Sequence, residues 1–139
     1  MYLLDTNVVS ELRPGRNRRP DARVVAWATS VAAEEMYLSS ICVLELEMGI
    51  LRKERIDPHQ ASFMRTWLEG YVLPSFSGRI RAVDTEVARR CAAMHVPVTR
   101  SYRDSLIAAT ASVHRMTVVT RNVADFLLTA VPVLNPWDF

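Results

Sequence analysis

The chain has 139 residues, of which half are hydrophobic and 23% are charged, and its formal net charge at pH 7 is +2. This length and composition predict one soluble globular domain, spanning residues 1–139, with a sizeable core. No apolar run approaches the roughly eighteen residues of a membrane span, and the N-terminus lacks the basic start and long apolar stretch of a signal peptide. We therefore expect a cytoplasmic protein that does not act at membranes.

The basic residues are sixteen arginines and a single lysine, Lys53. Arginine binds phosphate through a rigid two-pronged fork, so this bias fits a nucleic-acid partner. A composition bias of the source genome would give the same excess, and the arginines therefore count only as supporting evidence. Four of them lie in the polar loop at 13–20, which could grip a phosphate backbone, although a solvated surface loop is the simpler interpretation.

Apolar runs typical of strands alternate along the chain with stretches of helical spacing. The expected strands are residues 1–4, 36–39, 78–84 with the strand's exit, 116–120 and 131–134; the expected helices are residues 8–12, 24–33, 41–52, 60–71, 86–94, 104–114 and 124–128. The helix at 104–114 is apolar nearly all round, which predicts burial at the centre. The helix at 24–33 is expected to turn inward Val24, Val25, Trp27 and Ala28. This alternation implies a five-stranded, mainly parallel sheet with helices on both faces, an α/β/α sandwich.

The first expected strand ends at Asp5, which is followed by Thr6 and Asn7. Ligands of open parallel α/β sheets bind outside the carboxyl ends of the strands, so these polar residues are candidates for a site. The alternative is that they only cap the helix that begins at Val8. Taken alone, the capping interpretation is the simpler one.

Three further segments bring polar side chains to the same edge of the expected sheet. Glu45 lies about a turn and a half into the helix after the second strand, and Asp104 opens the helix before the fourth strand. Asn122 and Asp125 follow the fourth strand itself. The convergence of four separate segments on one edge indicates a common site.

Each of these acids also has a simpler interpretation. Glu47 competes with the neighbouring glutamate by spacing alone. Ser101-x-x-Asp104 and Asn122-x-x-Asp125 both resemble helix capping boxes, in which the acid would serve only the helix start.

An acidic cluster at this edge would require a counter-charge. Two carboxylates about 4 Å apart repel by roughly 4 kcal/mol at an effective dielectric constant near 20, so such a cluster indicates a bound cation. Ligands that are all oxygen suit Mg²⁺ or Mn²⁺ rather than zinc. The histidines show no ligand spacing, and the two cysteines, Cys42 and Cys91, are expected in the core. No Ser/His/Asp arrangement and no glycine-rich phosphate loop is present, so triad and nucleotide-kinase chemistry are unsupported.

Four segments carry a resemblance to a known family. They are residues 3–7 (LLDTN), 38–49 (from Leu-Ser to Glu-Leu-x-x-Gly), 104–111 (D-x-x-IAATA) and 120–126 (TRN-x-x-DF). In order and spacing they resemble the four motifs of PIN-domain ribonucleases of the VapC type, which are toxins of bacterial toxin–antitoxin pairs. Residues 23–27 (RVVAW), 78–80 (GRI) and 135–137 (NPW) further resemble the FitB-like branch. Each motif alone is weak, but the resemblance covers essentially the whole chain.

The resemblance implies a PIN-like fold and a metal-dependent endoribonuclease. It implies that Asp5, Glu45 and Asp104 hold Mg²⁺ or Mn²⁺, and it favours Glu45 over Glu47. Such an ion would lower the pKa of a bound water and neutralise the charge that develops on the phosphate during in-line attack. The expected catalytic residues are Asp5, Glu45, Asp104 and Asp125, and the expected site-shaping residues are Thr6, Asn7, Thr120 and Asn122.

Two positions depart from the family pattern. Cys42 stands where the family often has threonine, so a polar contact near Glu45 is expected to be missing. Asn122 stands where the family often has a fourth acid, which leaves Asp125 as a substitute. We expect one metal to be held firmly and a second only with substrate.

The resemblance also implies partners: an RNA substrate, a cognate antitoxin, a homodimer and a toxin–antitoxin hetero-oligomer. An acidic pocket accepts a guanidinium or ammonium group as well as a dication. We expect the antitoxin to insert an Arg or Lys among the acids. Its helix would lie on the apolar surface formed by residues 41–51 and 67–71.

Two other functions stay open at this point. A haloacid-dehalogenase-like phosphatase would also use an aspartate after the first strand, but it needs a second aspartate where this chain has Asn7, and a lysine late in the chain. A catalytically weak PIN-like module that only binds RNA or a partner is the second alternative, and Asn122 is the reason to consider it.

Overall fold

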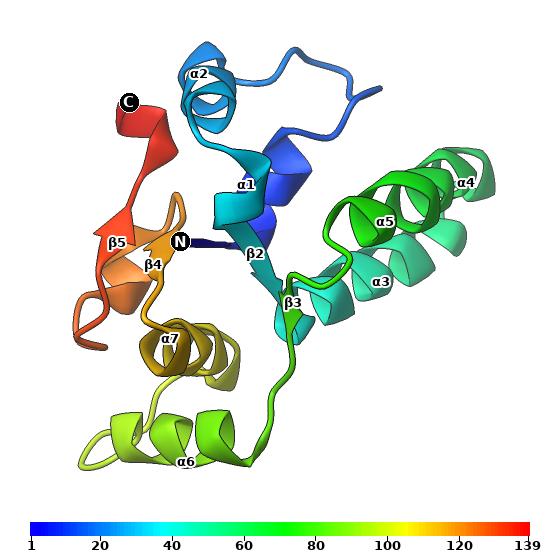
Figure 1. Ribbon diagram of the computed structural model, residues 1–139. Coiled ribbons are helices and arrows are strands. Elements are labelled where there is room, and N and C mark those ends of the chain that lie inside the picture. Colours follow the sequence, from blue (N-terminus) through cyan, green and yellow to red (C-terminus); the bar gives the residue numbers. More distant parts are fainter.

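The computed structural model describes residues 1–139 and contains one five-stranded sheet with the order β3–β2–β1–β4–β5 (Figure 1). All four pairs of neighbouring strands are parallel. The strands are β1 (Tyr2–Leu4), β2 (Met36–Ser39), β3 (Ile80–Arg81), β4 (Thr117–Val119) and β5 (Val133–Leu134). The prediction of a five-stranded, mainly parallel sheet is confirmed.

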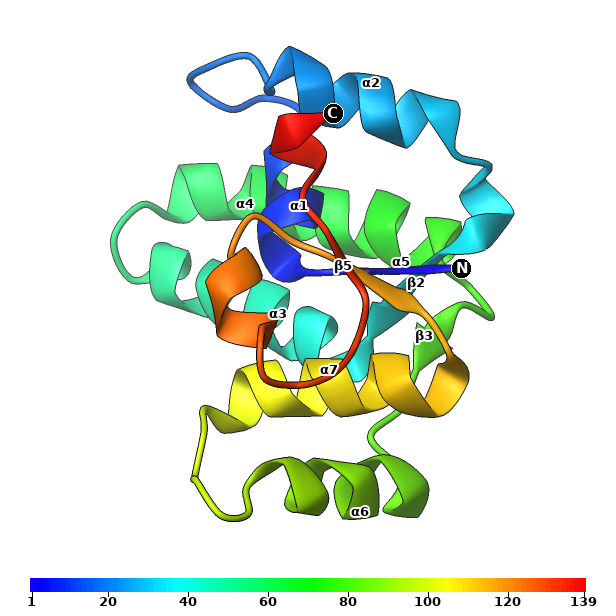
Figure 2. The same ribbon diagram turned by 90° about the vertical axis from the view of Figure 1, so that its left-hand side faces the viewer.

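Helices and short helical turns connect the strands. The α-helices are α1 (Thr6–Glu11), α2 (Ala22–Ser30), α3 (Ser40–Glu54), α4 (Pro58–Trp67), α5 (Leu73–Ser75), α6 (Thr85–Met94) and α7 (Tyr102–His114). The 3-10 turns are η1 (Ala33–Glu35), η3 (Val123–Phe126) and η4 (Pro136–Asp138), and η2 (Leu68–Val72) is a π-helical turn. In Figure 2, α6 and α7 lie on one side of the sheet and α1, α2 and α4 on the other. No helix is both long and apolar enough to cross a membrane.

Successive strand residues face two different cores. Leu4 and Val119 belong to a cluster of 13 buried residues that includes Trp27 of α2. Leu3 and Val118 belong to a second cluster, built against α7. Because side chains of a strand point alternately to opposite faces, an apolar run without polar interruption is what a sheet covered on both sides requires.

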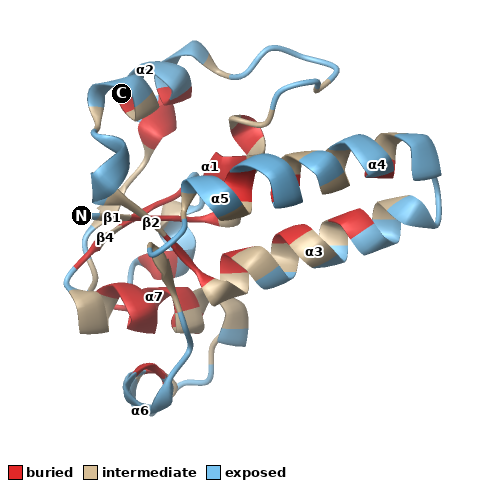
Figure 3. Ribbon diagram, turned by 45° about the vertical axis from the view of Figure 1, so that its right-hand side comes forward, coloured by how far each residue is buried: buried red, intermediate tan, exposed pale blue.

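Helix α7 contains more buried residues than any other helix, in agreement with its composition. Six of its residues are buried, among them Ile107, Ala108 and Ala111. It lies between the sheet and α6, and a small third cluster of Val87, Cys91 and Ala109 joins the two helices (Figure 3). The side chains of Cys42 and Cys91 are both buried and unpaired, in agreement with the prediction.

The helix expected at 24–33 ends at Ser30, the strand expected at 131–134 is only Val133–Leu134, and three other expected elements differ in kind or extent. Residues 60–71 do not form one helix, because α4 passes into the π-helical turn η2 at Leu68. The turn lies just before Pro74, which has no N–H to donate and clashes with an uninterrupted α-helix. The third strand is only Ile80–Arg81, since β3 is an edge strand that pairs with β2 alone. The segment at 124–128 is a 3-10 turn over Val123–Phe126.

The prediction that Val25 faces inward is wrong. Val24 and Trp27 are buried, whereas Val25 is 37% exposed. Adjacent helix residues lie about 100° apart around the axis, so a stripe that contains residues 24, 27 and 28 turns residue 25 toward solvent.

Candidate metal centre

Asp5 anchors the site at the carboxyl end of β1. Its backbone N–H donates to the carbonyl of Val119 at 2.9 Å, which ties the strand end to β4. Its carboxylate is fully buried, and Oδ1 accepts a hydrogen bond of 2.7 Å from the N–H of Thr6, at the start of α1. Asp5 is therefore a helix cap, as the simpler interpretation has it, and both oxygens of its carboxylate make further contacts.

A polar floor lies beneath this carboxylate. Asp5 Oδ2 accepts hydrogen bonds from Thr120 Oγ1 at 2.8 Å and from Asn7 Nδ2 at 3.4 Å. Thr120 Oγ1 in turn accepts from Asn7 Nδ2 and from the backbone N–H of Asn122, at 3.2 and 3.0 Å. The expected site-shaping residues thus meet at Asp5, with Asn122 contributing its backbone.

Glu45 approaches the same point from α3. Its Oε1 accepts a hydrogen bond of 2.7 Å from Thr6 Oγ1, so the hydroxyl contact that Cys42 does not supply comes from α1 instead. Burial raises the pKa of the Cys42 thiol to about 12, which keeps this neighbour of the site neutral.

The structure separates Glu45 from Glu47. The Glu47 carboxylate forms an ion pair with Arg65 on α4, where the two helices pack together. Residues two positions apart on a helix do not share a face, so only one of the two glutamates can reach the edge of the sheet. That residue is Glu45.

Asp104 comes from the first turn of α7. Ser101 precedes this helix without making a side-chain capping bond, and Asn122 likewise makes none at η3, so neither expected capping box forms. Burial raises the pKa of the Asp104 carboxyl, while its ion pair with Arg103 opposes the shift. The charges of Asp125 and Asp5 raise this pKa further, which places both acids electrostatically close to Asp104.

Asp125 lies at the margin of the cluster. It is exposed on η3, and its carboxylate makes no hydrogen bond or ion pair with the other acids. Asp125 acts on Asp104 only through its charge. It therefore lies near the three carboxylates but makes no direct contact with the guanidinium that joins them.

Arg103 is the residue that sequence reasoning missed. Its guanidinium lies among the three carboxylates and forms ion pairs with all of them: Nη2 with Asp5 Oδ1 at 2.7 Å, Nε with Glu45 Oε2 and Nη1 with Asp104 Oδ1. A sequence signal does exist, because a cation in the first turn of a helix opposes the helix dipole and therefore needs a compensating partner.

The three carboxylates supply the type of ligand atom that a hard dication such as Mg²⁺ prefers, and they point toward a common centre. Each directs one oxygen toward the point where the guanidinium lies, and oxygen-only donors are the set that Mg²⁺ and Mn²⁺ take. With the guanidinium among them, no group of three or more acids, histidines or cysteines is arranged to hold a metal ion. A guanidinium is wider than an ion whose oxygen ligands lie at about 2.1 Å, so the side chains must close up for the ion to bind.

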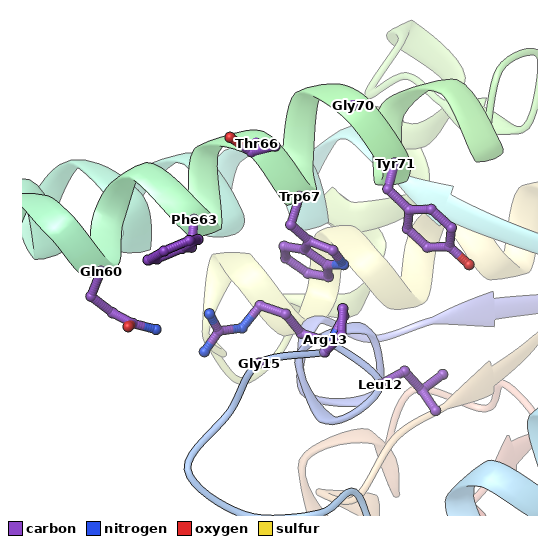
Figure 4. A pocket seen from close by; sticks show the side chains of 10 residues that line it. Leu12, Arg13, Gly15, Gln60, Phe63, Thr66, Trp67, Gly70 and Tyr71 are labelled. Atoms are coloured by element: carbon purple, nitrogen blue, oxygen red, sulfur yellow. The ribbon is translucent and has the colours of Figure 1, made fainter.

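An open groove of about 900 Å³ lies beside α4, separate from the acids. In Figure 4, the side chains of Phe63, Trp67 and Tyr71 line one wall, and the segment containing Leu12 and Arg13 forms the other. The guanidinium of Arg13 lies 6.0 Å from the centre of the Trp67 ring. Trp67 and Tyr71, which belong to the expected apolar surface at 67–71, therefore lie along this groove.

Residues 41–51 also present apolar side chains to solvent, as expected, but outside this groove. Leu44, Met48 and Leu51 of α3 are exposed, but none of them lines this groove.

The comparisons with known proteins agree with this fold. The PIN-domain family matches residues 2–130. The chain is 40% identical to toxin FitB of Neisseria gonorrhoeae and 34% identical to VapC ribonuclease Y4jK of Sinorhizobium fredii, in each case over 99% of both chains. The crystal structure of FitAcB from Neisseria gonorrhoeae superposes with a TM-score of 0.89 at 39% identity, over the full length of both chains. The chain therefore belongs to the PIN-domain family and, within it, to the toxins of the VapC and FitB type.

Proposed function

We propose that this protein is the toxin of a toxin–antitoxin pair and cleaves RNA with a Mg²⁺ or Mn²⁺ ion held by Asp5, Glu45 and Asp104. The observation that carries the proposal is the meeting of three carboxylates, from β1, α3 and α7, around one point. Such a cluster is costly for stability alone, because like charges repel, and is explained by a cation that the protein recruits.

The relatives support the reaction class. One is a VapC ribonuclease and another is a toxin, and both align with the chain over nearly its whole length. PIN-domain nucleases depend on metal ions, and the oxygen-only donor set favours magnesium or manganese over zinc. These relatives are PIN-domain proteins, so they give no support to the alternative of a haloacid-dehalogenase-like phosphatase.

The ion, when bound, would supply Lewis acidity, which makes water nucleophilic at neutral pH and offsets negative charge on the phosphate. The chain's own residues hold the ligands in place. Thr120 and Asn7 fix one oxygen of Asp5, and Thr6 fixes one oxygen of Glu45, so the other oxygen of each points into the centre. We propose that Asp125, at the margin beside Asp104, attracts a further cation when substrate binds.

We also propose a cognate antitoxin as the partner. A ribonuclease free in its own cell would degrade that cell's RNA, and the relative from Neisseria gonorrhoeae carries the name of a toxin. The apolar groove beside α4 is a surface of the kind that an amphipathic helix covers.

Cleavage of total cellular RNA in Mn²⁺ and in EDTA tests the function. Asp104→Asn keeps the side-chain volume but removes a ligand charge, and we expect a folded protein with activity reduced by about a hundredfold or more. The matched control is Glu47→Gln, which changes a glutamate of α3 that faces Arg65 and is expected to retain activity. Full activity of the Asp104→Asn variant, or equal cleavage in EDTA, would refute the assignment. RNA binding without any cleavage by the wild type would favour the binding-module alternative.

A further inference from the structure

Arg103 contacts the three candidate ligands in a one-to-one pattern. Each of its three guanidinium nitrogens donates to a different carboxylate, one from β1, one from α3 and one from α7. The contacts reach residues 98 and 58 positions away in the sequence as well as the adjacent Asp104. One planar group thus occupies the point on which the three acids converge.

The oxygens that Arg103 uses are the ones that an ion would need. Asp5 Oδ2 is held by Thr120 and Asn7, and Glu45 Oε1 is held by Thr6. The oxygens that face the centre are Asp5 Oδ1, which also accepts from the N–H of Thr6, and Glu45 Oε2, and the guanidinium is bonded to both. A dication and the guanidinium therefore compete for the same oxygens of the same carboxylates.

Charge explains why the guanidinium is there. Three carboxylates without a cation would repel one another in a largely buried site, and one guanidinium relieves part of that repulsion. It leaves an excess of two negative charges, so the cluster still attracts a dication.

Arg103 also lies on the solvent side of the cluster. Its side chain is 31% exposed, whereas the carboxylate of Asp5 below it is completely buried. Arg103 is therefore accessible to a polymer that approaches the acids from solvent. Other arginines nearby are engaged elsewhere: Arg100 donates to the carbonyl of Met94, and Arg121 lies over the ring of Trp137.

We propose that Arg103 is an exchangeable counter-ion, which pairs with Asp5, Glu45 and Asp104 in the metal-free protein and turns to the RNA phosphate when the ion displaces it. The inference rests on the proposed metal site. A guanidinium binds two phosphate oxygens as readily as two carboxylate oxygens, so the same fork serves both states. Arg103 thereby keeps the empty site neutralised and becomes a substrate-positioning residue in the loaded one.

Calorimetric titration of Mn²⁺ into the RNA-free protein tests the exchange directly. Arg103→Gln removes the competing charge, and we expect Mn²⁺ affinity to rise by about tenfold or more. Arg103→Lys keeps the charge but cannot reach three carboxylates at once, so its affinity is expected between the two. The control is Arg89→Ala, which removes one exposed arginine from α6 and is expected to bind Mn²⁺ like the wild type. Circular dichroism establishes that each variant is folded.

The second measurement is RNA cleavage at saturating Mn²⁺. If Arg103 positions the phosphate, Arg103→Gln raises KM for RNA about tenfold or more while it binds the ion more tightly. Unchanged or weaker Mn²⁺ affinity in Arg103→Gln, with the wild type binding normally, overturns the exchange and leaves the metal site intact. Mn²⁺ binding by neither protein overturns the metal site as well. If Arg103→Gln binds Mn²⁺ more tightly but its KM for RNA is unchanged, the proposed role of Arg103 in positioning the RNA phosphate is overturned.

Discussion

The hydroxyl of Thr120 donates a hydrogen bond of 2.8 Å to Oδ2 of Asp5, across 115 positions of the sequence. Both side chains are completely buried, and the same hydroxyl accepts from Asn7 and from the N–H of Asn122. One hydroxyl thus gives its only proton to the carboxylate and accepts two others, which uses its full hydrogen-bonding capacity. Thr120 fixes the direction in which Asp5 presents its other oxygen.

Thr120→Val removes this hydroxyl at nearly constant volume. Asp5 loses a donor and two donors lose their acceptor, so we expect the free energy of unfolding to fall by about 1–3 kcal/mol, measured by urea denaturation. Mn²⁺ affinity is expected to fall as well, because the Asp5 carboxylate becomes free to rotate. Thr120→Ser is the control, since it keeps the hydroxyl, and it is expected to retain most of the affinity. A valine variant as stable and as strong a metal binder as the wild type would contradict this role.

A metal ion that binds the folded protein but not the unfolded chain must raise the thermal stability of the protein. At about a hundred times its dissociation constant, Mg²⁺ or Mn²⁺ is expected to stabilise the fold by roughly 2.7 kcal/mol, a rise in melting temperature on the order of 10 °C. The measurement is a thermal melt in Mn²⁺ and in EDTA, with Asp104→Asn as the variant that should respond less. Identical melting temperatures in the two buffers would argue strongly against the site.

Glu11 provides a pH-dependent contribution to stability away from the metal centre. It is buried at the end of α1, where Arg16 and Arg18 form ion pairs with it and the N–H of Asp21 donates to it at 2.8 Å. Burial alone would raise the pKa of this carboxyl, but the hydrogen bonds outweigh burial and lower the pKa from 4.5 to about 2. Two of the four arginines in the loop at 13–20, Arg16 and Arg18, therefore fix the loop to the end of α1.

Because the pKa of Glu11 is lower in the folded state, its ion pairs stabilise the protein above about pH 4.5 and are lost as the pH falls toward 2. Glu11→Gln is expected to cost roughly 2–4 kcal/mol at pH 7, since it leaves buried donors with a weaker acceptor. Urea midpoints measured between pH 7 and pH 3 should fall less steeply in the variant than in the wild type. Equal slopes would mean that another group controls acid unfolding.

The positions of the acids were predictable because they follow from topology. An apolar run that ends at Asp5, and a helix that starts at Asp104 and leads back into a strand, place both residues at one edge of a parallel sheet. The choice of Glu45 over Glu47 needed the resemblance, since it depends on the packing of Arg65 from α4. Nothing in the spacing of single residues shows which face of α3 meets α4.

Arg103 could not be placed from sequence for a related reason. Its role depends on a side-chain conformation that reaches segments 58 and 98 positions away, and only the assembled fold brings these within reach. The capping interpretation is correct for Asp5, whereas the capping boxes expected at Ser101 and Asn122 do not form. Asp5 does cap α1, but Oδ1, the oxygen that accepts the capping bond, also pairs with Arg103, so the cap and the site are compatible.

Aromatic side chains that are largely exposed to solvent line the groove beside α4. Phe63 is 59% exposed and Tyr71 is 65% exposed, and both lie with Trp67 along one wall (Figure 4). Aromatic residues that cluster on one surface dominate the affinity of protein interfaces. The proposed antitoxin therefore has an anchoring surface that is distinct from the acids and from Arg103.

Phe63→Glu tests whether the antitoxin occupies this groove. The side chain is exposed, so the free energy of unfolding should change by no more than about 0.5 kcal/mol, and RNA cleavage by the free toxin should be unaffected. A charge placed in an apolar contact is expected to cost about 2 kcal/mol or more of binding, a loss of affinity of roughly thirtyfold or more for the antitoxin, measured by calorimetry. The matched control is Ile56→Glu, which places the same charge on an apolar residue that is 80% exposed and lies outside the groove. If Ile56→Glu weakens the complex and Phe63→Glu does not, the antitoxin lies on the outer end of α3 instead, because only a contact there would sense the new charge.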